Sequence, residues 1–321
     1  MMRLIHCIAV IALAMIANSA FADDYPSRPV KIIVPFGAGG PADVTARLLA
    51  QNLQDKLKQP FVVEDKPGAG AVIGTVEVAR SAPDGYTLLM MSNTQTANES
   101  LLPQRNYELM RDFVAVAPVN TSDLVIVVHP SVPAKTLKEF IALAKSEPGR
   151  LNYASSGQGT PYHMAGELFK TMTGTDIVHV PHRSSGDART SVLGGQVQMM
   201  IDAVTTMAPN ASASQVRALA TTGKTRSSVL PDVPTADEAG VPGYEATIWL
   251  GVMAPKGTPQ AVVDKLNAEI NTAIKQPETI KLWAAQGATP MTMSPAEFEK
   301  FLRGDIVKWA AVVKTFPTKP Q

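Results

Sequence analysis

The stretch IVPFGAGGPADVTARLLAQ, residues 33–51, decides how the chain folds, because a β-rich run passes through a cluster of glycines directly into a helical pattern. The β run ends at Phe36, and three glycines follow within four residues. Over residues 42–58 the apolar side chains recur at helical spacing, which places Val44, Leu48, Leu49, Leu53 and Leu57 on one expected face. A strand, a glycine turn and a helix in this order predict one βα unit of an α/β domain.

The glycine turn also fits the loose spacing of a dinucleotide-binding loop. Gly37, Gly39 and Ala42 satisfy G-x-G-x-x-[GA], and Glu64 and Asp65 follow the next apolar run, where a ribose-binding acid is sought. A lone match of this spacing is weak. The start of the chain argues against this reading.

The chain begins with one arginine, a short apolar run and Ala20-Phe21-Ala22, which predicts a secretory signal peptide over residues 1–22, cleaved after Ala22. The apolar run from Ile8 to Ala17 is too short to span a bilayer as a helix. The one cysteine, Cys7, leaves with the signal, so no disulfide, thiol chemistry or cysteine-bound metal is expected. An exported protein meets little nicotinamide cofactor, and we expect no cofactor.

Removal of 22 residues from 321 leaves 299, enough for two domains of ordinary size. Without Arg3, 28 basic residues balance 28 acidic ones, and no basic run suggests binding to nucleic acid.

Strand and helix patterns alternate along the rest of the chain. The expected strands are residues 30–36, 61–65, 86–92, 123–129, 151–155, 176–181, 197–203, 216–222 and 248–255. Helix starts are predicted at the capping box Thr136-x-x-Glu139, after Thr258-Pro259 and at Ser294-Pro295. This alternation predicts α/β domains with largely parallel sheets.

The opening motif recurs 120 residues later. GAGGPADVTARLL at 37–49 aligns with GQGTPYHMAGELF at 157–169, so that glycines, proline and leucine coincide. In each copy proline takes the first helical position, and Gly40 or Thr160 stands at the N-cap. Free backbone N–H groups and the positive end of the helix dipole then point into the loop, which makes an anion site without a charged side chain.

Two such loops on two α/β units suggest one ligand gripped from both sides, at the carboxyl ends of the strands. Neither loop has the lysine or the spacing of a phosphate-binding P-loop. Carboxylates are therefore favoured over nucleotide phosphates, while ordinary βα turns remain the alternative for either loop alone.

Characteristic blocks follow one another from about Tyr25 to Trp309, among them YPSRPVKIIVPFGAGGPADVTARLLA (25–50), YASSGQGTPYHMAGELFKTMTG (153–174) and RALATTGKTRSSVLPDVPTADEAGVPGYE (217–245). In these blocks the chain resembles the Bug-type solute-binding receptors of tripartite tricarboxylate transporters. The resemblance implies a periplasmic-binding-protein fold of type II-like architecture, with two α/β lobes and a ligand cleft between them. It also implies that a small organic acid, often a dicarboxylate, is bound by the two glycine loops, partly through ordered waters.

Carried over residue by residue, the resemblance implies a set of ligand-binding residues from both loops and from nearby strand ends. They are Phe36, Ala38, Gly39, Gly40, Ser92, Thr94, Ser155, Ser156, Gly157, Gly159, Thr160, His163 and Asp202. His163 has an alternative role in fixing its helix start, and Asp43 is interpreted as a first-turn acid that stabilises the helix dipole. The sequence VPHRSSG at 180–186 departs from the family's usual VPYKGS, and Asp202-Ala203 stands where Asp-Asn is common.

An exported enzyme is the competing hypothesis. Ser156, His163 and Asp202 could form a triad, but no G-x-S-x-G elbow is present. His163, His179 and His182 could form a metal cluster, but their spacing matches no zinc motif. We expect no catalytic residue and no bound metal.

The lobes are expected to comprise residues 23–121 with 248–321 and residues 122–247. The resemblance implies a monomer in the periplasm that delivers its ligand to the membrane permease subunits of the transporter, or instead signals to a sensor kinase.

Overall fold

Helices and strands alternate through residues 25–314 and 316, which the computed structural model of the chain describes; the predicted signal peptide and Cys7 lie outside them. The strands are β1 (Val30–Val34), β2 (Phe61–Asp65), β3 (Thr87–Ser92), β4 (Phe113–Val128), β5 (Asn152–Ser155), β6 (Val178–Pro181), β7 (Met199–Ala203), β8 (Arg217–Thr221), β9 (Thr247–Pro255) and β10 (Ala288–Pro290). The helices are α2 (Pro41–Leu57), α3 (Val72–Ala79), α4 (Asn93–Leu101), α5 (Leu109–Asp112), α6 (Leu137–Ser146), α7 (Pro161–Thr173), α8 (Ser185–Leu193), α9 (Val204–Ser212), α10 (Gln260–Ile274), α11 (Pro277–Gln286) and α12 (Pro295–Val313).

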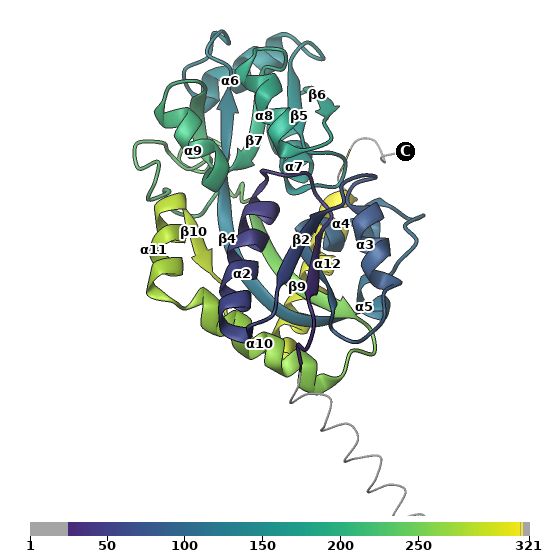
Figure 1. The fold of residues 1–321 in the computed structure, drawn as a ribbon. Coiled ribbons are helices and arrows are strands. Elements are labelled where there is room, and N and C mark those ends of the chain that lie inside the picture. The colour runs from purple at the N-terminus through teal and green to yellow at the C-terminus, as the bar shows by residue number, and fades with distance from the viewer. Residues whose placement is uncertain (1–24, 315, 317–321) are drawn as a thin grey trace, which may run out of the picture.

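Two α/β bodies lie one above the other in Figure 1, and strand β4 runs through both. The upper body, here the second lobe, holds α6–α9 with β5, β6 and β7, whereas the first lobe holds the beginning and the end of the described chain. The strand order is β2-β1-β3-β9-β4-β7-β5-β6, with β8 and β10 also paired to β4.

The sheets are mixed, so the expectation of largely parallel sheets is wrong for the central strands. Parallel pairs occur at the outer parts, where β1 pairs with β2 and β3, and β5 pairs with β6 and β7. Strands β4 and β9 run antiparallel to their neighbours. A chain that crosses between two lobes and returns must do so on strands of opposite direction, which explains the antiparallel centre.

Strand β4 is longer than the expected strand over residues 123–129, because it begins at Phe113. Pro118 hid the first half, since proline is rare inside a sheet. The register with β9 shifts between Ala115 and Ala117 and again between Pro118 and Asn120. These bulges admit the proline without ending the strand.

Sheet membership changes within β4. Its pairs with β9 extend to Asp123 and Thr247, and from Leu124 it pairs with β7. The lobe limits expected near residues 121/122 and 247/248 lie close to this change and stay a prediction.

Helix α2 packs on the sheet largely with the expected face, because Leu49 and Leu53 are buried and Leu48 and Leu57 pack against the core. Its buried residues are Ala42, Asp43, Thr45, Ala46, Leu49, Ala50 and Leu53. Val44 is 45% exposed, so its place on the inner face was wrong. Small alanines lie at the contact beside these leucines, and they let the helix approach the sheet closely.

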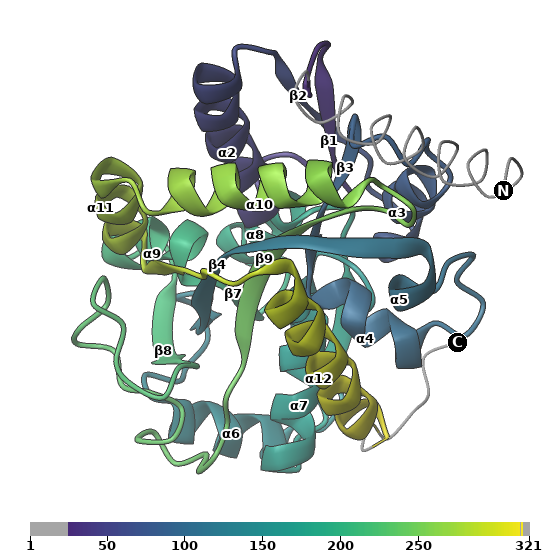
Figure 2. The same cartoon turned by 90° about the horizontal axis from the view of Figure 1, so that it is seen from below.

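Helices α10 and α12 lie on opposite sides of the β4–β9 ribbon in Figure 2. Val262 and Leu266 of α10 belong to the core cluster that contains Val116 and Ala117, and Phe298 and Leu302 of α12 pack with Ala115, Trp249 and Met253. The predicted start of α12 at Ser294-Pro295 is confirmed, and Ser294 and Glu297 form a capping box there. The predicted capping box of α6 is half formed. The Thr136 side chain accepts from Glu139 N, but Glu139 Oε2 accepts from Lys135 N and not from Thr136 N.

Candidate functional site

The two repeated glycine loops face each other across a cleft between the lobes. Its inner compartment, about 30 Å3, is lined by Phe36, Gly37, Gly40, Pro41, Ala42, Ser92, Ser156, Pro161, Tyr162, Ser185, Ile248 and Leu250. Its outer compartment, about 270 Å3, is lined by Pro35, Phe36, Pro67, Gly68, Ala69, Gly70, Ala71, Ser156, Gly157, Thr160, His182 and Arg183. Because Phe36 and Ser156 line both, the two compartments adjoin.

Four helices begin at this cleft. The N-cap residues are Gly40 for α2, Ser92 for α4, Thr160 for α7 and Ser184 for α8. At each of these helices the N-cap or the first helical residue lines one of the compartments. The positive ends of four helix dipoles therefore converge on one small volume, which favours a bound anion.

The first turns of α2 and α7 leave backbone donors unpaired. Within the part of the chain that the structure describes, the N–H groups of Ala42, Asp43, Tyr162 and His163 meet no acceptor. The proline at the first position of each helix has no N–H to satisfy. These ends are therefore able to donate to an oxyanion.

Among the residues that the structure describes, neither compartment is lined by an acidic side chain. Apart from Tyr162 in the inner compartment, the ionisable residues of the two linings are His182 and Arg183, both in the outer compartment. A negatively charged ligand would therefore meet no carboxylate of the lining.

The first loop is fixed by Asp43, whose Oδ2 accepts a hydrogen bond from Gly39 N at 2.8 Å. Arg47 bridges Asp43 and Asp65, with Nε 2.6 Å from Asp43 Oδ1 and Nη2 3.0 Å from Asp65 Oδ2. Burial, and then the neighbouring Asp43, raises the pKa of Asp65. Asp43 and Asp65 therefore support the loop from behind, and Asp65 is not a free ribose-binding acid.

The second loop is fixed in the same way by His163, whose Nδ1 accepts from Gly159 N at 3.2 Å. The His163 ring lies 4.3 Å from that of His179. His179 Nε2 is 2.6 Å from Ser155 Oγ, and Ser155 Oγ accepts from Gly157 N at 3.1 Å. Two histidines thus hold both glycines of this loop, one directly and one through Ser155.

Both histidines are held neutral by their surroundings. Burial lowers the pKa of His163 to about 4, with Lys170 adding to the effect. Burial, and then His163, lowers the pKa of His179 to about 3. The neutral ring gives His163 Nδ1 the lone pair that accepts from Gly159 N.

Asp202 lies at the end of β7 and is fully buried. Its Oδ2 is 3.0 Å from both Arg189 Nε and Arg189 Nη2, and its Oδ1 accepts from Ala203 N at 2.8 Å. Burial raises the pKa of Asp202, and Arg189 partly offsets this. The carboxylate is thus fully engaged inside the second lobe.

Ser92 and Thr94 form the start of α4. Ser92 Oγ accepts from Thr94 N at 3.1 Å, and Gln95 Oε1 accepts from Ser92 N at 3.0 Å. Ser92 also lines the inner compartment, whereas Thr94 is buried within the lobe.

The structure brings about half of the predicted ligand-binding residues to the cleft lining. Those in a lining are Phe36, Gly40, Ser92, Ser156, Gly157 and Thr160. Those outside both linings are Ala38, Gly39, Thr94, Ser155, Gly159, His163 and Asp202. Of the second group, Ala38 and Gly39 are exposed, and the other five are buried.

Sequence reasoning missed the start of α8 and the strand β9 as parts of the lining. Ser185 is the last residue of the departure HRSS that had marked this segment as unusual, but no glycine pair indicated a ligand loop there. Ile248 and Leu250 belong to an apolar strand whose pattern does not show which residues face a cleft.

Glycines let the two lobes touch through their backbones. A side chain at Gly159 would overlap Asn98 Oδ1 of the first lobe, and one at Gly70 would come within 2.7 Å of Gln158 O in the second. Gly40 would meet Ser185 Oγ at 2.8 Å. The close approach of the lobes therefore depends on the absence of Cβ atoms at these positions.

The competing enzyme hypotheses find no support in these contacts. His163 Nδ1 and Asp202 are occupied by Gly159 and Arg189, and the serine bonded to a histidine is Ser155 and not Ser156. Over residues 25–314 and 316, no group of three or more His, Cys, Asp or Glu side chains could hold a metal ion. No helix in the same range is long and apolar enough to cross a membrane.

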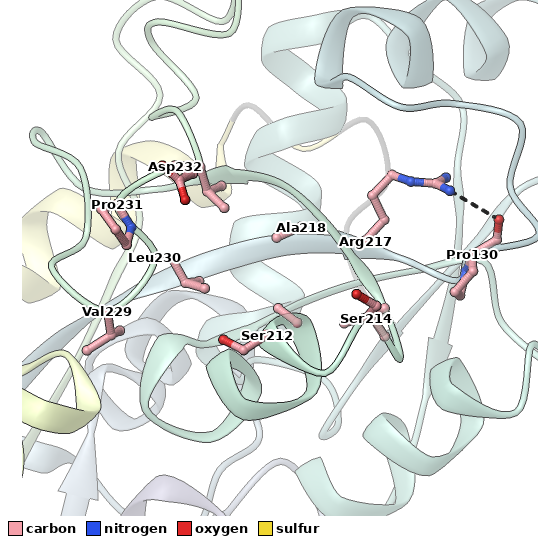
Figure 3. Close-up of a pocket in the computed structure, with 12 residues that line it drawn as sticks. Pro130, Ser212, Ser214, Arg217, Ala218, Val229, Leu230, Pro231 and Asp232 are labelled. Carbon is pink, nitrogen blue, oxygen red and sulfur yellow. Dashed lines mark hydrogen bonds between the residues drawn. The ribbon is translucent and has the colours of Figure 1, made fainter.

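A separate pocket of about 480 Å3 lies on the second lobe, lined by residues of α9, β8 and the segment 229–233 (Figure 3). Its arginine, Arg217, donates to the carbonyls of Val132 at 3.0 Å and Ala134 at 2.8 Å, and Asp232 adds an acid to the lining. The guanidinium is therefore already engaged, which makes this pocket a poorer anion site than the cleft.

Comparison with known proteins identifies relatives over almost the whole chain. The sequence model of the tripartite tricarboxylate transporter family receptor, TctC, matches residues 45–317. The chain is 41% identical to Protein BugT of Bordetella pertussis over 317 residues, which cover 98% of this chain and 97% of that protein.

Two solved structures from Rhodopseudomonas palustris are similar in fold. Rpa4515 with adipate is 33% identical, with a TM-score of 0.88 over 91% of this chain and 98% of that one. MatC with bound malate is 33% identical, with a TM-score of 0.86 over 90% and 100%.

Proposed function

The chain belongs to the tripartite tricarboxylate transporter receptor family, and from this premise we propose that it captures a small dicarboxylate in the cleft between its lobes. Its fold is the α/β fold of periplasmic binding proteins, and the family is one of binding proteins and not of enzymes. The choice of ligand and the residues that touch it are our inference.

The convergence of four helix N-termini on a cleft whose described lining residues include no acid is the observation that carries this proposal. Such ends stabilise negative charge, and the unpaired N–H groups of Ala42 and Tyr162 offer donors from each lobe. The predicted residues that line the cleft, Phe36, Gly40, Ser92, Ser156, Gly157 and Thr160, are the contacts we propose.

The solved relatives support the ligand class. Adipate has six carbons and malate four, and both carry two carboxyl groups. We therefore propose a diacid in this size range for the present chain.

Capture proceeds by closure of the lobes. The inner compartment has room for about two water molecules at 10–15 Å3 each, so a diacid enters when the lobes are apart. Closure then brings the second glycine loop onto the ligand, and the closed form is what the membrane permease recognises. Identical small-angle scattering with and without a bound diacid would rule this step out.

The protein acts in the periplasm and delivers its ligand to the permease subunits of a tripartite tricarboxylate transporter. This location agrees with a relative described as a periplasmic transporter, 40% identical with a TM-score of 0.87.

Calorimetric titration with matched acids tests the ligand class. A thermal-shift series of diacids from four to eight carbons selects the ligand, because binding raises stability by mass action. Each diacid is then titrated beside the monoacid of equal length, such as adipate beside hexanoate.

A monoacid leaves the donors of one loop unpaired, so we expect the diacid to bind about tenfold to a hundredfold more tightly. Equal affinities in every pair would show that only one loop grips a charge. Slow conversion of a bound acid would instead indicate an enzyme.

A further inference from the structure

Among the residues that the structure describes, the cleft lining holds one arginine, Arg183, which lies in the outer compartment. Arg183 precedes the N-cap of α8, and its side chain is 94% exposed. Its partner is Asp187, with 3.8 Å between Arg183 Nε and Asp187 Oδ2. An exposed pair at this distance is weak and screened by salt.

Other arginines near the cleft are already engaged by carboxylates. Arg47 is held between Asp43 and Asp65, and Arg189 is paired with the buried Asp202. Both lie outside the two linings. Arg183 is therefore the arginine that can pair with a ligand in the cleft while breaking only a weak, exposed ion pair.

The wall beside Arg183 comes from the first lobe, through the segment Pro67–Ala71. Asn98 Nδ2 donates to Gly70 O at 2.8 Å and fixes this segment. The N–H groups of Ala69 and Gly70 meet no acceptor among residues 25–314 and 316. The outer compartment thus combines a cation of one lobe with polar backbone of the other.

The two compartments differ in what they offer a carboxylate. The inner one has helix N-termini and no charged side chain, whereas the outer one has Arg183. Phe36 and Ser156 line both, so a ligand that reaches from one to the other passes the Phe36 ring. A chain of methylene groups suits that contact.

We infer that Arg183 is the residue that selects for the second carboxylate of the ligand. This inference rests on the proposed function: one carboxylate lies at the helix N-termini beside the inner compartment, and the other lies in the outer compartment against Arg183. When the diacid binds, the guanidinium of Arg183 leaves Asp187 and pairs with the second carboxylate of the ligand. A monoacid has no group for this exchange.

Calorimetric titration of Arg183→Gln with adipate and hexanoate tests the inference. We expect the affinity for adipate to fall about twofold to fivefold, as for an ion pair at an exposed side chain, and the affinity for hexanoate to stay unchanged. Arg183→Lys, which keeps the charge, should retain most of the preference for adipate.

Arg150→Gln is the matched control, because Arg150 also forms a weak surface pair, 4.0 Å from Glu147, and lines neither compartment. It should leave both affinities unchanged. If the wild-type protein prefers adipate and Arg183→Gln keeps that preference, the inference is overturned while the proposed function stands. If the wild-type protein binds no acid of the four- to eight-carbon series, the proposed function falls, and the inference with it.

Discussion

The backbone N–H of Gly159 donates to Nδ1 of His163 over 3.2 Å. The same relationship exists 120 residues earlier, where Gly39 N donates to Asp43 Oδ2 over 2.8 Å. In both loops a side chain in the first helical turn holds the glycine four residues before it. The two copies of the motif therefore hold their glycine loops in the same way, the first with a carboxylate and the second with a neutral imidazole.

His163→Ala should weaken both the loop and ligand binding. The change leaves Gly159 N unpaired, at about 1–3 kcal/mol of unfolding free energy for a buried donor. We expect adipate affinity to fall about tenfold by calorimetry. His163→Asn is the control, because Asp43 shows that a short side chain at this position reaches the equivalent N–H. Equal losses in both variants would contradict a role as hydrogen-bond acceptor.

Acidification should destabilise the protein through the two buried histidines. Their pKa values in the fold are about 4 and about 3, below the usual 6.5 of the unfolded chain. Between these values the unfolded state binds more protons, so stability is full above pH 6.5 and falls towards pH 4. The slope is at most about 1.4 kcal/mol per pH unit for each histidine.

Denaturant unfolding at pH 7 and pH 5 measures this loss. Buried acids such as Asp202 have raised pKa values and act in the opposite direction, so the comparison must be made with His163→Asn. We expect the variant to lose less stability than the wild-type protein between the two pH values. An identical loss would show that His163 does not contribute.

Gly159→Ala should reduce adipate affinity at least tenfold, whereas Gly39→Ala should change it little. The two glycines have φ angles of +76° and +74°, so alanine carries the same backbone strain at both, about 1–2 kcal/mol. Only at Gly159 would the new Cβ overlap Asn98 of the other lobe. Thermal unfolding of both variants measures the backbone strain, and titration with adipate measures the effect on lobe closure. Equal adipate affinities of the two variants would refute a role of the lobe contact at Gly159.

Asp202→Ala should destabilise the fold by about 3–5 kcal/mol, because it leaves Arg189 without its buried partner. Asp202 lines neither compartment, so adipate affinity at 15 °C, measured on the folded fraction, should stay within about twofold of wild type. A large loss of affinity with little loss of stability would instead make Asp202 a ligand contact.

The sequence predicted the βα units and the two glycine loops well, since the repeat of Gly37, Gly39 and Pro41 at Gly157, Gly159 and Pro161 states their geometry directly. It could not tell which loop residues face the cleft. Ala38 and Gly39 are exposed and Gly40 is buried, because a loop has no regular period from which direction can be deduced.

The sequence also could not show which residues from distant parts of the chain complete the cleft lining. Ser185 and Leu250 enter the lining only because two lobes meet, and no local pattern encodes that meeting. Pro118 is a different case: proline is rare inside a sheet, but two bulges in β4 admit it.

Strand β4 belongs to the sheets of both lobes. Residues 113–123 pair with β9 in the sheet of the first lobe, and residues 124–128 are flanked by β7 and β8 in that of the second. Because both sheets contain this strand, separating the chain into its two lobes would remove a central strand from one of them. The two halves are therefore not separable modules, because each depends on the shared strand for its stability, and one cannot be exchanged alone between relatives.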